Sequence, residues 1–375
     1  MSKLPHITTS IFSKMSLMAK QYKAINLSQG FPDFPIDQEL KSLITKAVHD
    51  NVHQYCPSSG HLGLLDAIGE LIENSYQRNV EVHDEILVTA GATQAIFTAI
   101  QALVNPGDEV LVLDPSYDCY IAPIHLCKAK PVRVPLGSDF LPDWETIKRF
   151  VSPKTKLIIT NNPHNPSGRT WGESDMKQLQ ELLQNNSNLY VLSDEVYEFI
   201  TFENKHLSVH SYEALREKSI VVSSFGKTLH VTGWKVGYVV ANKKIMTELK
   251  KIHQYMVFSV NSLCQHVIYE YLKRSSFQQI GTLYKEKRDL FRKGIEKSRF
   301  GILPCQGTYF QTLDYSNISN KSDIEFTEDL TRIHGVASIP ISVFSEHPKH
   351  KHVIRFCFAK ENDTIKKATD LLCKI

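Results

Sequence analysis

The sequence predicts an α/β fold in which a largely parallel sheet carries helices on both faces and a smaller α+β domain follows. Between residue 86 and about residue 250, short apolar runs alternate with stretches of helical periodicity, a pattern typical of a parallel sheet covered by helices. Beyond about residue 251 the pattern is mainly helical, with two further strand-like runs. A length of 375 residues is too great for one small core and favours two domains.

Helices and one loop precede the first predicted strand. Apolar residues recur at helical spacing over 11–24, 36–50 and 62–76. Between the first two of these helices, Gly30, Pro32 and Pro35 break any regular element, so residues 29–35 form a loop. Gly30 can offer its backbone N–H to a ligand at close range, although a plain turn explains the same residues.

Five apolar runs are interpreted as buried strands of the central sheet. They cover residues 86–88, 109–113, 157–160, 190–192 and 220–222. One helix opens at Thr93 and another covers 174–186. In the second domain, a long amphipathic helix at 278–297 could bridge the domains, and strands within 307–315 and 352–359 enclose a helix over 322–335.

Composition and charge exclude several classes of protein. Hydrophobic residues make up 42% and charged residues 22%, and the net charge of +3 is spread without a long basic block, so neither nucleic acid nor a membrane is expected as a partner. The N-terminus lacks the apolar stretch of a signal peptide, and no apolar run is long enough to span a bilayer. Seven cysteines without a CxxC pair favour reduced thiols, a cytoplasmic location and no metal site.

Polar residues follow each apolar run at the point where the predicted strand ends. These residues are Thr89, Gly91 and Thr93, then Asp114 and Tyr117, Asn161 and Asn165, Asp194 and Tyr197, and finally Ser224 and Lys227. The carboxyl ends of parallel strands lie at one edge of a sheet, where open α/β folds bind their ligands. Several polar ends at one edge are best explained by a bound ligand.

The residue types at this edge indicate what the ligand carries. Small residues at 91–93 open a helix whose free N–H groups attract an anion such as phosphate, and Ser224 and Lys235 are expected nearby. Asp194 would be costly at the end of a buried strand without a cationic partner. Lys227 offers a nucleophilic amine, and we expect Gly226 to allow the turn that presents it.

Pyridoxal phosphate satisfies all of these positions. Its aldehyde forms a Schiff base with lysine, its pyridinium nitrogen pairs with a carboxylate, and its phosphate accepts backbone N–H bonds. NAD fits less well because no GxGxxG follows the first strand, and the glycine-rich pattern of a P-loop is missing. Taken alone, Lys227 is as readily a surface lysine and the turn at 91–93 a simple helix cap, so the combination carries the prediction.

Five motifs together resemble the pyridoxal-phosphate-dependent class I and II aminotransferases of fold-type I. They are NNPHNPSG, SDEVY, SSFGKT, GWKVG and IRFCFAK, and the resemblance covers nearly the whole chain. NLSQGFPDFP, DPSYDCY, HQYMVFSVN and GTYF are similar to the methionine and kynurenine aminotransferase branch, as is Lys235 where the wider superfamily usually has arginine. The resemblance implies a seven-stranded sheet in a large domain at 41–280, and a small domain made of 1–40 and 281–375.

The resemblance also implies roles at the cofactor. Lys227 would form the Schiff base and move the proton, Asp194 would keep the pyridine nitrogen protonated, and Tyr117 would stack on the ring. Asn165 and Tyr197 would hydrogen-bond the phenolic oxygen. The phosphate would be held by Gly91, Ala92, Thr93, Ser224 and Lys235, and by Tyr55 of the other subunit in a homodimer.

The implied reaction is a ping-pong transfer of an amino group from an L-amino acid to a 2-oxo acid, with pyridoxamine phosphate as the alternate form of the cofactor. Arg355 would grip the substrate carboxylate through its planar fork, assisted by Asn165 and the Gly30 backbone. Residues 255–261 contain no arginine for a second carboxylate. With Phe12, Phe31 and, from the other subunit, Phe258 near the pocket, a neutral sulfur-containing or aromatic donor is expected.

Three alternatives use the same sequence features. A cysteine-conjugate β-lyase would share the cofactor pocket and is the runner-up. A transcription regulator built on this fold would need an N-terminal DNA-binding domain, for which the early start of the motifs leaves no room. A degenerate binding protein is disfavoured because every expected catalytic residue is present.

Overall fold

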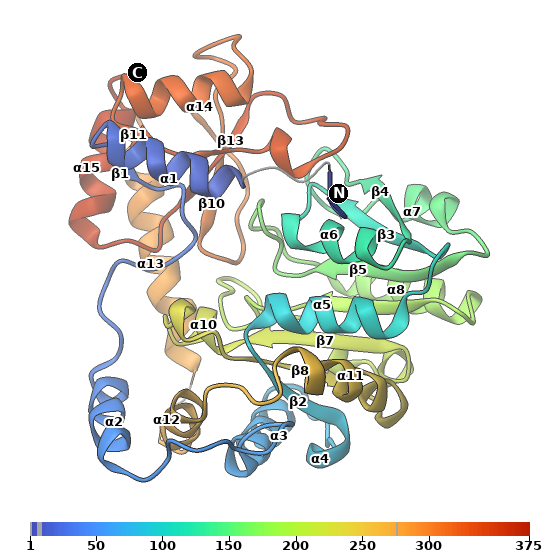
Figure 1. The fold of residues 1–375 in the computed structure, drawn as a ribbon. Helices are drawn as coiled ribbons and strands as arrows, with labels where there is room; N and C mark the ends of the chain where they lie inside the picture. The colour runs from blue at the N-terminus through green and yellow to red at the C-terminus, as the bar shows by residue number, and fades with distance from the viewer. Residues whose placement is uncertain (1, 6–9, 275–276) are drawn as a thin grey trace.

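A seven-stranded sheet forms the middle of the computed structural model, which describes residues 2–5, 10–274 and 277–375 (Figure 1). Across the sheet the strands are β2 (Ile86–Thr89), β8 (Gly237–Ala241), β7 (Ser219–Ser224), β6 (Tyr190–Asp194), β5 (Thr155–Asn161), β3 (Glu109–Asp114) and β4 (Lys130–Pro135). Strand β8 is antiparallel to both of its neighbours, and the pairs from β7 to β4 are parallel. The predicted mostly parallel α/β sheet is confirmed.

Helices cover both faces of this sheet because successive side chains of each strand point to opposite sides. In β3, Val110 and Val112 pack against one helical layer, and Leu111 packs against the other. The first layer contains α5 (Ala92–Leu103), α6 (Ile121–Leu126) and α11 (Lys243–Met256). The second contains α2 (Gln38–His49), α3 (Leu62–Tyr76), α7 (Trp144–Phe150), α8 (Glu173–Asn185), α9 (Glu213–Arg216) and α12 (Ser262–Leu272).

Strands β4 and β8 were not predicted from the sequence. Strand β4 carries Pro131 and Pro135, which remove ladder donors and are tolerated here because β4 is an edge strand. Strand β8 begins at Gly237, the last residue of the GWKVG motif, which was interpreted only as part of the binding site. No element was assigned to the first segment from the sequence, and the second was assigned only to the binding site.

A second, four-stranded antiparallel sheet holds the other main core. Its strands are β12 (Ile339–Pro340), β13 (Val353–Cys357), β10 (Phe310–Asp314) and β9 (Gly301–Ile302), and a separate parallel pair joins β1 (Ile25–Asn26) to β11 (Val336–Ala337). Around them lie α1 (Ile11–Gln21), α13 (Gln278–Ile295), α14 (Asp323–Arg332) and α15 (Asn362–Leu372) (Figure 1). This α+β arrangement agrees with the pattern expected after residue 251, and the domain boundaries at 40 and 280 stay a prediction.

Helix ends differ from the expected bounds by a few residues. The helix expected over 36–50 begins at Gln38 because the carboxylate of Asp37 caps it, accepting hydrogen bonds from the N–H groups of Glu39 and Leu40. The helix expected over 11–24 ends at Gln21, before Lys23 adopts a left-handed φ of 51°. The remaining short elements are α4 (Val82–Glu85), α10 (Phe225–Thr228), η1 (Asp118–Tyr120), η2 (Val209–Ser211), η3 (Thr232–Trp234) and η4 (Ser342–Phe344). Within the described ranges, every helix is too short or too polar to cross a bilayer.

Candidate active site

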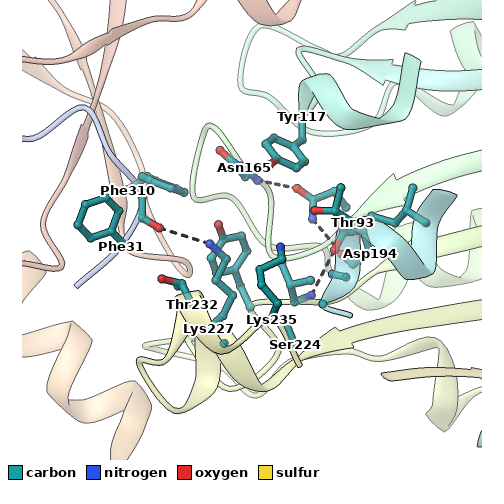
Figure 2. A pocket seen from close by; sticks show the side chains of 18 of the residues that line it. Phe31, Thr93, Tyr117, Asn165, Asp194, Ser224, Lys227, Thr232, Lys235 and Phe310 are labelled. Atoms are coloured by element: carbon teal, nitrogen blue, oxygen red, sulfur yellow. Dashed lines mark hydrogen bonds between the residues drawn. The ribbon is translucent and has the colours of Figure 1, made fainter. Parts of the chain in front are cut away.

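A cavity of about 320 Å³ lies beyond the carboxyl ends of the central strands. Fourteen of the predicted site residues line it, namely Phe12, Gly30, Phe31, Gly91, Ala92, Thr93, Tyr117, Asn165, Asp194, Tyr197, Ser224, Lys227, Lys235 and Arg355. Figure 2 shows Thr93, Asp194, Ser224 and Lys235 on one side of it and Phe31 and Phe310 on the other. The cavity therefore lies between the edge of the central sheet on one side and the N-terminal loop and the second sheet on the other.

Asp194 is a buried carboxylate at the end of β6. It accepts a hydrogen bond of 2.6 Å from the hydroxyl of Tyr120 and a longer one of 3.4 Å from the backbone N–H of Val196. Burial raises its pKa to about 6, although the Tyr120 hydrogen bond acts in the opposite direction. Both donors are neutral, so the carboxylate is well placed to receive a cation from a ligand in the cavity.

Lys227 lies on the single-turn helix α10, directly after β7. Its Nζ donates to the hydroxyl of Tyr309 at 2.8 Å and to the carbonyl of Gly30 at 3.3 Å. Burial, together with the nearby positive charges of Lys235 and Arg355, lowers its pKa to about 8. A large fraction of this amine is neutral near pH 8, as a nucleophile or a proton acceptor requires.

The expectation that Gly226 allows a turn before Lys227 is wrong. Gly226 lies inside α10. A Cβ at this position would come within 3.2 Å of Thr232 Cα and 3.3 Å of Ser224 Oγ. Close packing of α10 against residue 232, and not a turn conformation, is the reason for a glycine here.

The N-terminus of α5 and the side chain of Lys235 lie close together at the cavity. Gly91 starts the helix with a φ of 75°, and no side chain caps the helix there. Lys235 adopts a left-handed φ of 55°, and a Cβ on Gly91 would lie only 3.2 Å from its Nζ. The helix dipole, the first N–H groups and the ammonium therefore act at one place, which suits a phosphate.

Arg355 of β13 holds its guanidinium over the cavity. It donates to Asn165 Oδ1 at 2.7 Å and to the carbonyl of Ser28 at 3.2 Å. The guanidinium carbon lies 3.9 Å from the centre of the Phe310 ring. Its Nε is buried and has no hydrogen-bond partner among the described residues. A carboxylate of the substrate would supply one.

Asn165, Tyr117 and Tyr197 face the cavity from three loops. The backbone N–H of Asn165 donates to Asn161 Oδ1 at 2.7 Å, and Asn161 Nδ2 in turn donates to the backbone carbonyl of Asp194 at 2.9 Å. Burial raises the pKa of both tyrosines far above neutral pH, so their hydroxyls remain hydrogen-bond donors. These contacts fix the loop of Asn165 to the strand end of Asp194.

Tyr55 and Phe258 lie outside this cavity. Their side chains are exposed, at 81% and 49% respectively, and their rings meet edge to face at 5.3 Å. The sequence prediction places both residues in the cavity of a second subunit, and that assignment stays a prediction.

Asp114 corrects the assumption that all polar strand ends meet at one site. It forms an ion pair with Arg133 and accepts a hydrogen bond from the backbone N–H of Glu346 at 3.0 Å. It does not line the cavity. Its role is to join β3, β4 and the segment after η4, so a polar residue at a strand end is insufficient to identify a ligand contact.

Tyr120, Tyr309 and Phe310 are functional candidates that the sequence prediction missed. Tyr120 follows the predicted Tyr117 by only three residues, so this short spacing could have predicted that Tyr120 lies near the site. Phe310 starts β10 and Tyr309 directly precedes it, and β10 pairs with the strand of Arg355. Only the pairing of these two strands, far apart in sequence, brings them to the cavity.

The donor set fits pyridoxal phosphate. The amine of Lys227, the carboxylate of Asp194 with neutral donors only, and the anion site at Gly91 match its aldehyde, ring nitrogen and phosphate. No group of three or more His, Cys, Asp or Glu side chains within the described ranges could hold a metal ion.

Comparisons with known proteins agree with this chemistry. The family model for aminotransferase class I and II matches residues 22–372. The chain is 43% identical to a methionine aminotransferase of Escherichia coli over 99% of its length and 97% of that protein, and a solved structure described as an E. coli methionine aminotransferase superposes with a TM-score of 0.98, covering 100% of this chain and 99% of that one.

Two further relatives extend the likeness. A kynurenine–oxoglutarate transaminase of Dictyostelium discoideum is 31% identical over 98% of this chain and 94% of that protein. The structure of an N-succinyldiaminopimelate aminotransferase from Mycobacterium tuberculosis, 31% identical, superposes with a TM-score of 0.95 over 100% of this chain and 99% of that one. The chain therefore belongs to the class I and II aminotransferases, which are pyridoxal-phosphate-dependent enzymes of fold-type I.

Proposed function

We propose that this aminotransferase takes the amino group from a neutral sulfur-containing or aromatic L-amino acid and passes it to a 2-oxo acid. The observation that carries the proposal is the charge of the cavity, whose described lining contains three cations, Lys227, Lys235 and Arg355. Those three have assigned tasks, and the rest of the substrate side is formed by Phe12, Phe31 and Phe310. A second substrate carboxylate would find no cation of its own there.

The relatives support this substrate class. One is named a methionine aminotransferase and another a kynurenine–oxoglutarate transaminase, so a thioether and an aromatic side chain are both represented. Aromatic walls favour both through dispersion and sulfur–aromatic contacts. No observation favours the β-lyase alternative.

Each charged part of the cofactor has a matching group in the cavity. We assign the phosphate to Ala92, Thr93, Ser224 and Lys235, with Gly91 allowing the close approach of Lys235. Asp194 would pair with the protonated ring nitrogen. When bound, pyridoxal phosphate supplies an electron sink for the charge left when the substrate Cα–H is deprotonated.

The remaining roles fall to residues that orient the reactants. Tyr117 would cover the ring, and Asn165 and Tyr197 would donate to its phenolic oxygen. Arg355 would bind the substrate carboxylate, with the backbone of Gly30 beside it. The amine of Lys227, whose pKa is about 8, would then take the proton from the substrate Cα and deliver it to the cofactor.

We also propose a homodimer in a cytoplasmic setting. The exposed ring pair of Tyr55 and Phe258, with exposed Tyr255 and Met256 close to Phe258 in sequence, offers an apolar surface that a second copy of the chain would cover. In that dimer Tyr55 would reach the partner's phosphate site and Phe258 the partner's substrate pocket. All seven cysteines are free thiols, as a reducing compartment favours.

A panel of amino donors tests the proposed specificity. Methionine, phenylalanine, kynurenine, aspartate and cysteine conjugates would each be mixed with the holoenzyme, and the change in cofactor absorbance followed. We expect fast conversion with the first three and slow conversion with aspartate. Preference for aspartate would overturn the substrate class. Pyruvate, ammonia and thiol from the conjugates, without a new amino acid, would identify a β-lyase.

A further inference from the structure

The hydrogen bonds of the free Lys227 amine point to a role for Tyr309. The Tyr309 hydroxyl donates to the Gly30 carbonyl at 2.6 Å and accepts a hydrogen bond from Lys227 Nζ at 2.8 Å. Lys227 Nζ also donates to the same Gly30 carbonyl at 3.3 Å. The amine, the hydroxyl and the carbonyl thus form a closed triangle in which two N–H groups of the lysine are engaged.

Tyr309 is held firmly in place. It is fully buried, and its ring lies between those of Tyr197 and Tyr284, with centroid distances of 5.2 and 5.6 Å. Its backbone carbonyl accepts from the N–H of Phe358 at 3.0 Å. The hydroxyl is therefore a fixed acceptor, and the lysine side chain is the flexible partner that moves to it.

The triangle selects one chemical state of Lys227. A lysine nitrogen joined to the cofactor through a C=N bond carries at most one hydrogen, whereas the free amine carries two or three. When the amino group of a donor replaces Lys227, one C=N bond breaks as another forms, and the two amine hydrogens of the donor pass to the lysine nitrogen. Only the released amine can then donate to both Tyr309 and Gly30.

We propose that Tyr309, together with the Gly30 carbonyl, is a positioning site for Lys227 in its released state. The proposal deepens the proposed function and rests on it. By stabilising only the free amine, Tyr309 favours the form of the enzyme in which the cofactor carries the amino group. It also links Lys227, at the edge of the central sheet, to the N-terminal loop of Gly30 and to the segment before β10 that carries Tyr309.

The test is the equilibrium between the two cofactor forms in Tyr309→Phe holoenzyme. Absorbance of the enzyme equilibrated with set ratios of methionine and its oxo acid gives the equilibrium constant of the half-reaction. One net hydrogen bond corresponds to a shift of about five- to tenfold, here toward the lysine-linked form. A change in rate or melting temperature without a change in this constant would leave Tyr309 a purely structural residue and overturn the proposal.

Tyr284→Phe provides the matched control. Tyr284 is also fully buried and packs on Tyr309, but its hydroxyl has no hydrogen-bond partner among the described residues. We expect the equilibrium constant to stay within about twofold of wild type. An equal shift in both variants would assign the effect to packing of the aromatic cluster and contradict the proposal.

A second measurement separates this proposal from the proposed function. Full-length protein freed of cofactor would be titrated with pyridoxal phosphate and with pyridoxamine phosphate. The lysine leaves its positioning site only for the first ligand, so Tyr309→Phe should tighten pyridoxal phosphate relative to pyridoxamine phosphate by the same factor of about five to ten. An unchanged affinity ratio overturns the positioning role, whether or not any donor converts the wild-type cofactor. Failure of all donors on wild type contradicts the transaminase assignment alone.

Discussion

The charged side chains on the two walls of the cavity differ in how the surrounding protein holds them. We call Asp194, Lys227 and Lys235, which lie at the edge of the central sheet, the cofactor wall. We call Gly30, Phe310 and Arg355, which come from the N-terminal loop and the second sheet, the substrate wall. Asp194 is held by neutral donors and its pKa is raised to about 6, and the pKa of Lys227 is lowered to about 8. Arg355 is already hydrogen-bonded on two sides and stacked on Phe310.

This difference shows on which wall the charged side chains depend on a ligand for their stabilisation. On the cofactor wall, burial acts against the charged form of both Asp194 and Lys227, so each gains when an opposite charge or a covalent partner arrives. On the substrate wall, the guanidinium is oriented before the substrate binds, and its Nε has no hydrogen-bond partner among the described residues. We therefore expect substitutions on the cofactor wall to remove the reaction, and substitutions on the substrate wall to change affinity and preference.

The largest effect is expected from Lys227→Ala. In the proposed mechanism the variant would lose both the covalent partner of the cofactor and the group that moves the Cα proton, so kcat should fall by about 10⁴-fold or more. The measurement is turnover of methionine, together with the visible absorbance of the lysine-linked cofactor, which should vanish. Lys243→Ala, at an exposed lysine on α11, is the matched control and should retain wild-type activity. Substantial turnover in Lys227→Ala would contradict the assigned role.

The second largest effect is expected from Asp194→Asn. The amide keeps an oxygen for the hydroxyl of Tyr120 but removes the negative charge that we propose pairs with the ring nitrogen. Loss of one buried electrostatic group of this kind typically lowers the rate by about 10²- to 10³-fold. Single-turnover rates with a saturating donor would measure this, and an unchanged rate would show that Asp194 does not act on the ring.

The same substitution should raise stability when the cofactor is absent. The folded pKa of Asp194, about 6, lies above its ordinary value of 3.8, so the folded protein binds more protons between these values and loses stability as the pH rises through that range. Below about pH 4 the difference between variant and wild type should be small, and above about pH 6 Asp194→Asn should be more stable by about 2–3 kcal/mol. Urea unfolding of cofactor-free protein at pH 4 and pH 8 checks both the sign and the range.

The sequence could predict the cofactor wall much better than the contacts that support it. Asp194, Lys227 and Ser224 each follow an apolar strand within a few residues, so a local pattern and the geometry of parallel sheets place them together. Tyr309 reaches Lys227 only through the pairing of β10 with β13, and Tyr120 reaches Asp194 from a different loop. The residues near each of these positions in the sequence do not predict such long-range contacts. The error at Asp114 has the same origin, since its partner Arg133 lies on the unpredicted strand β4.

On the substrate wall, Arg355→Lys should act on affinity more than on chemistry. Lysine retains the positive charge but cannot bond Asn165, the Ser28 carbonyl and a substrate carboxylate with one planar group. Loss of a charge-assisted, bidentate contact is worth about 1.5–3 kcal/mol, or roughly a 10- to 100-fold rise in KM. Steady-state kinetics with methionine would show this, with a much smaller change in kcat. A fall in kcat alone, at constant KM, would mean that Arg355 does not hold the ground-state carboxylate.

The smallest effect is expected from Lys360→Met. This variant is also the most specific test of the difference between the cofactor wall and the substrate wall. Lys360 is buried, its Nζ donates to the carbonyl of Phe31 at 2.9 Å, and it lies 4.7 Å from the centre of the Phe31 ring. It thereby fastens the loop that carries the half-exposed Phe31 at the mouth of the cavity. Methionine keeps the apolar stem but removes this bond, so KM for methionine and phenylalanine should rise about three- to tenfold while kcat stays nearly constant.

Alanine as a donor separates loop positioning from carboxylate binding in this variant. Its methyl group is too short to depend on the Phe31 ring, so its KM should change less than that of methionine. Lys366→Met, at an exposed lysine of α15, is the control for loss of a positive charge and should match wild type with both donors. Equal increases in KM for alanine and methionine would mean that Lys360 acts through Arg355 and the carboxylate. The preference for large side chains would then have to come from the fixed rings of Phe12 and Phe310, because the loop would no longer account for it.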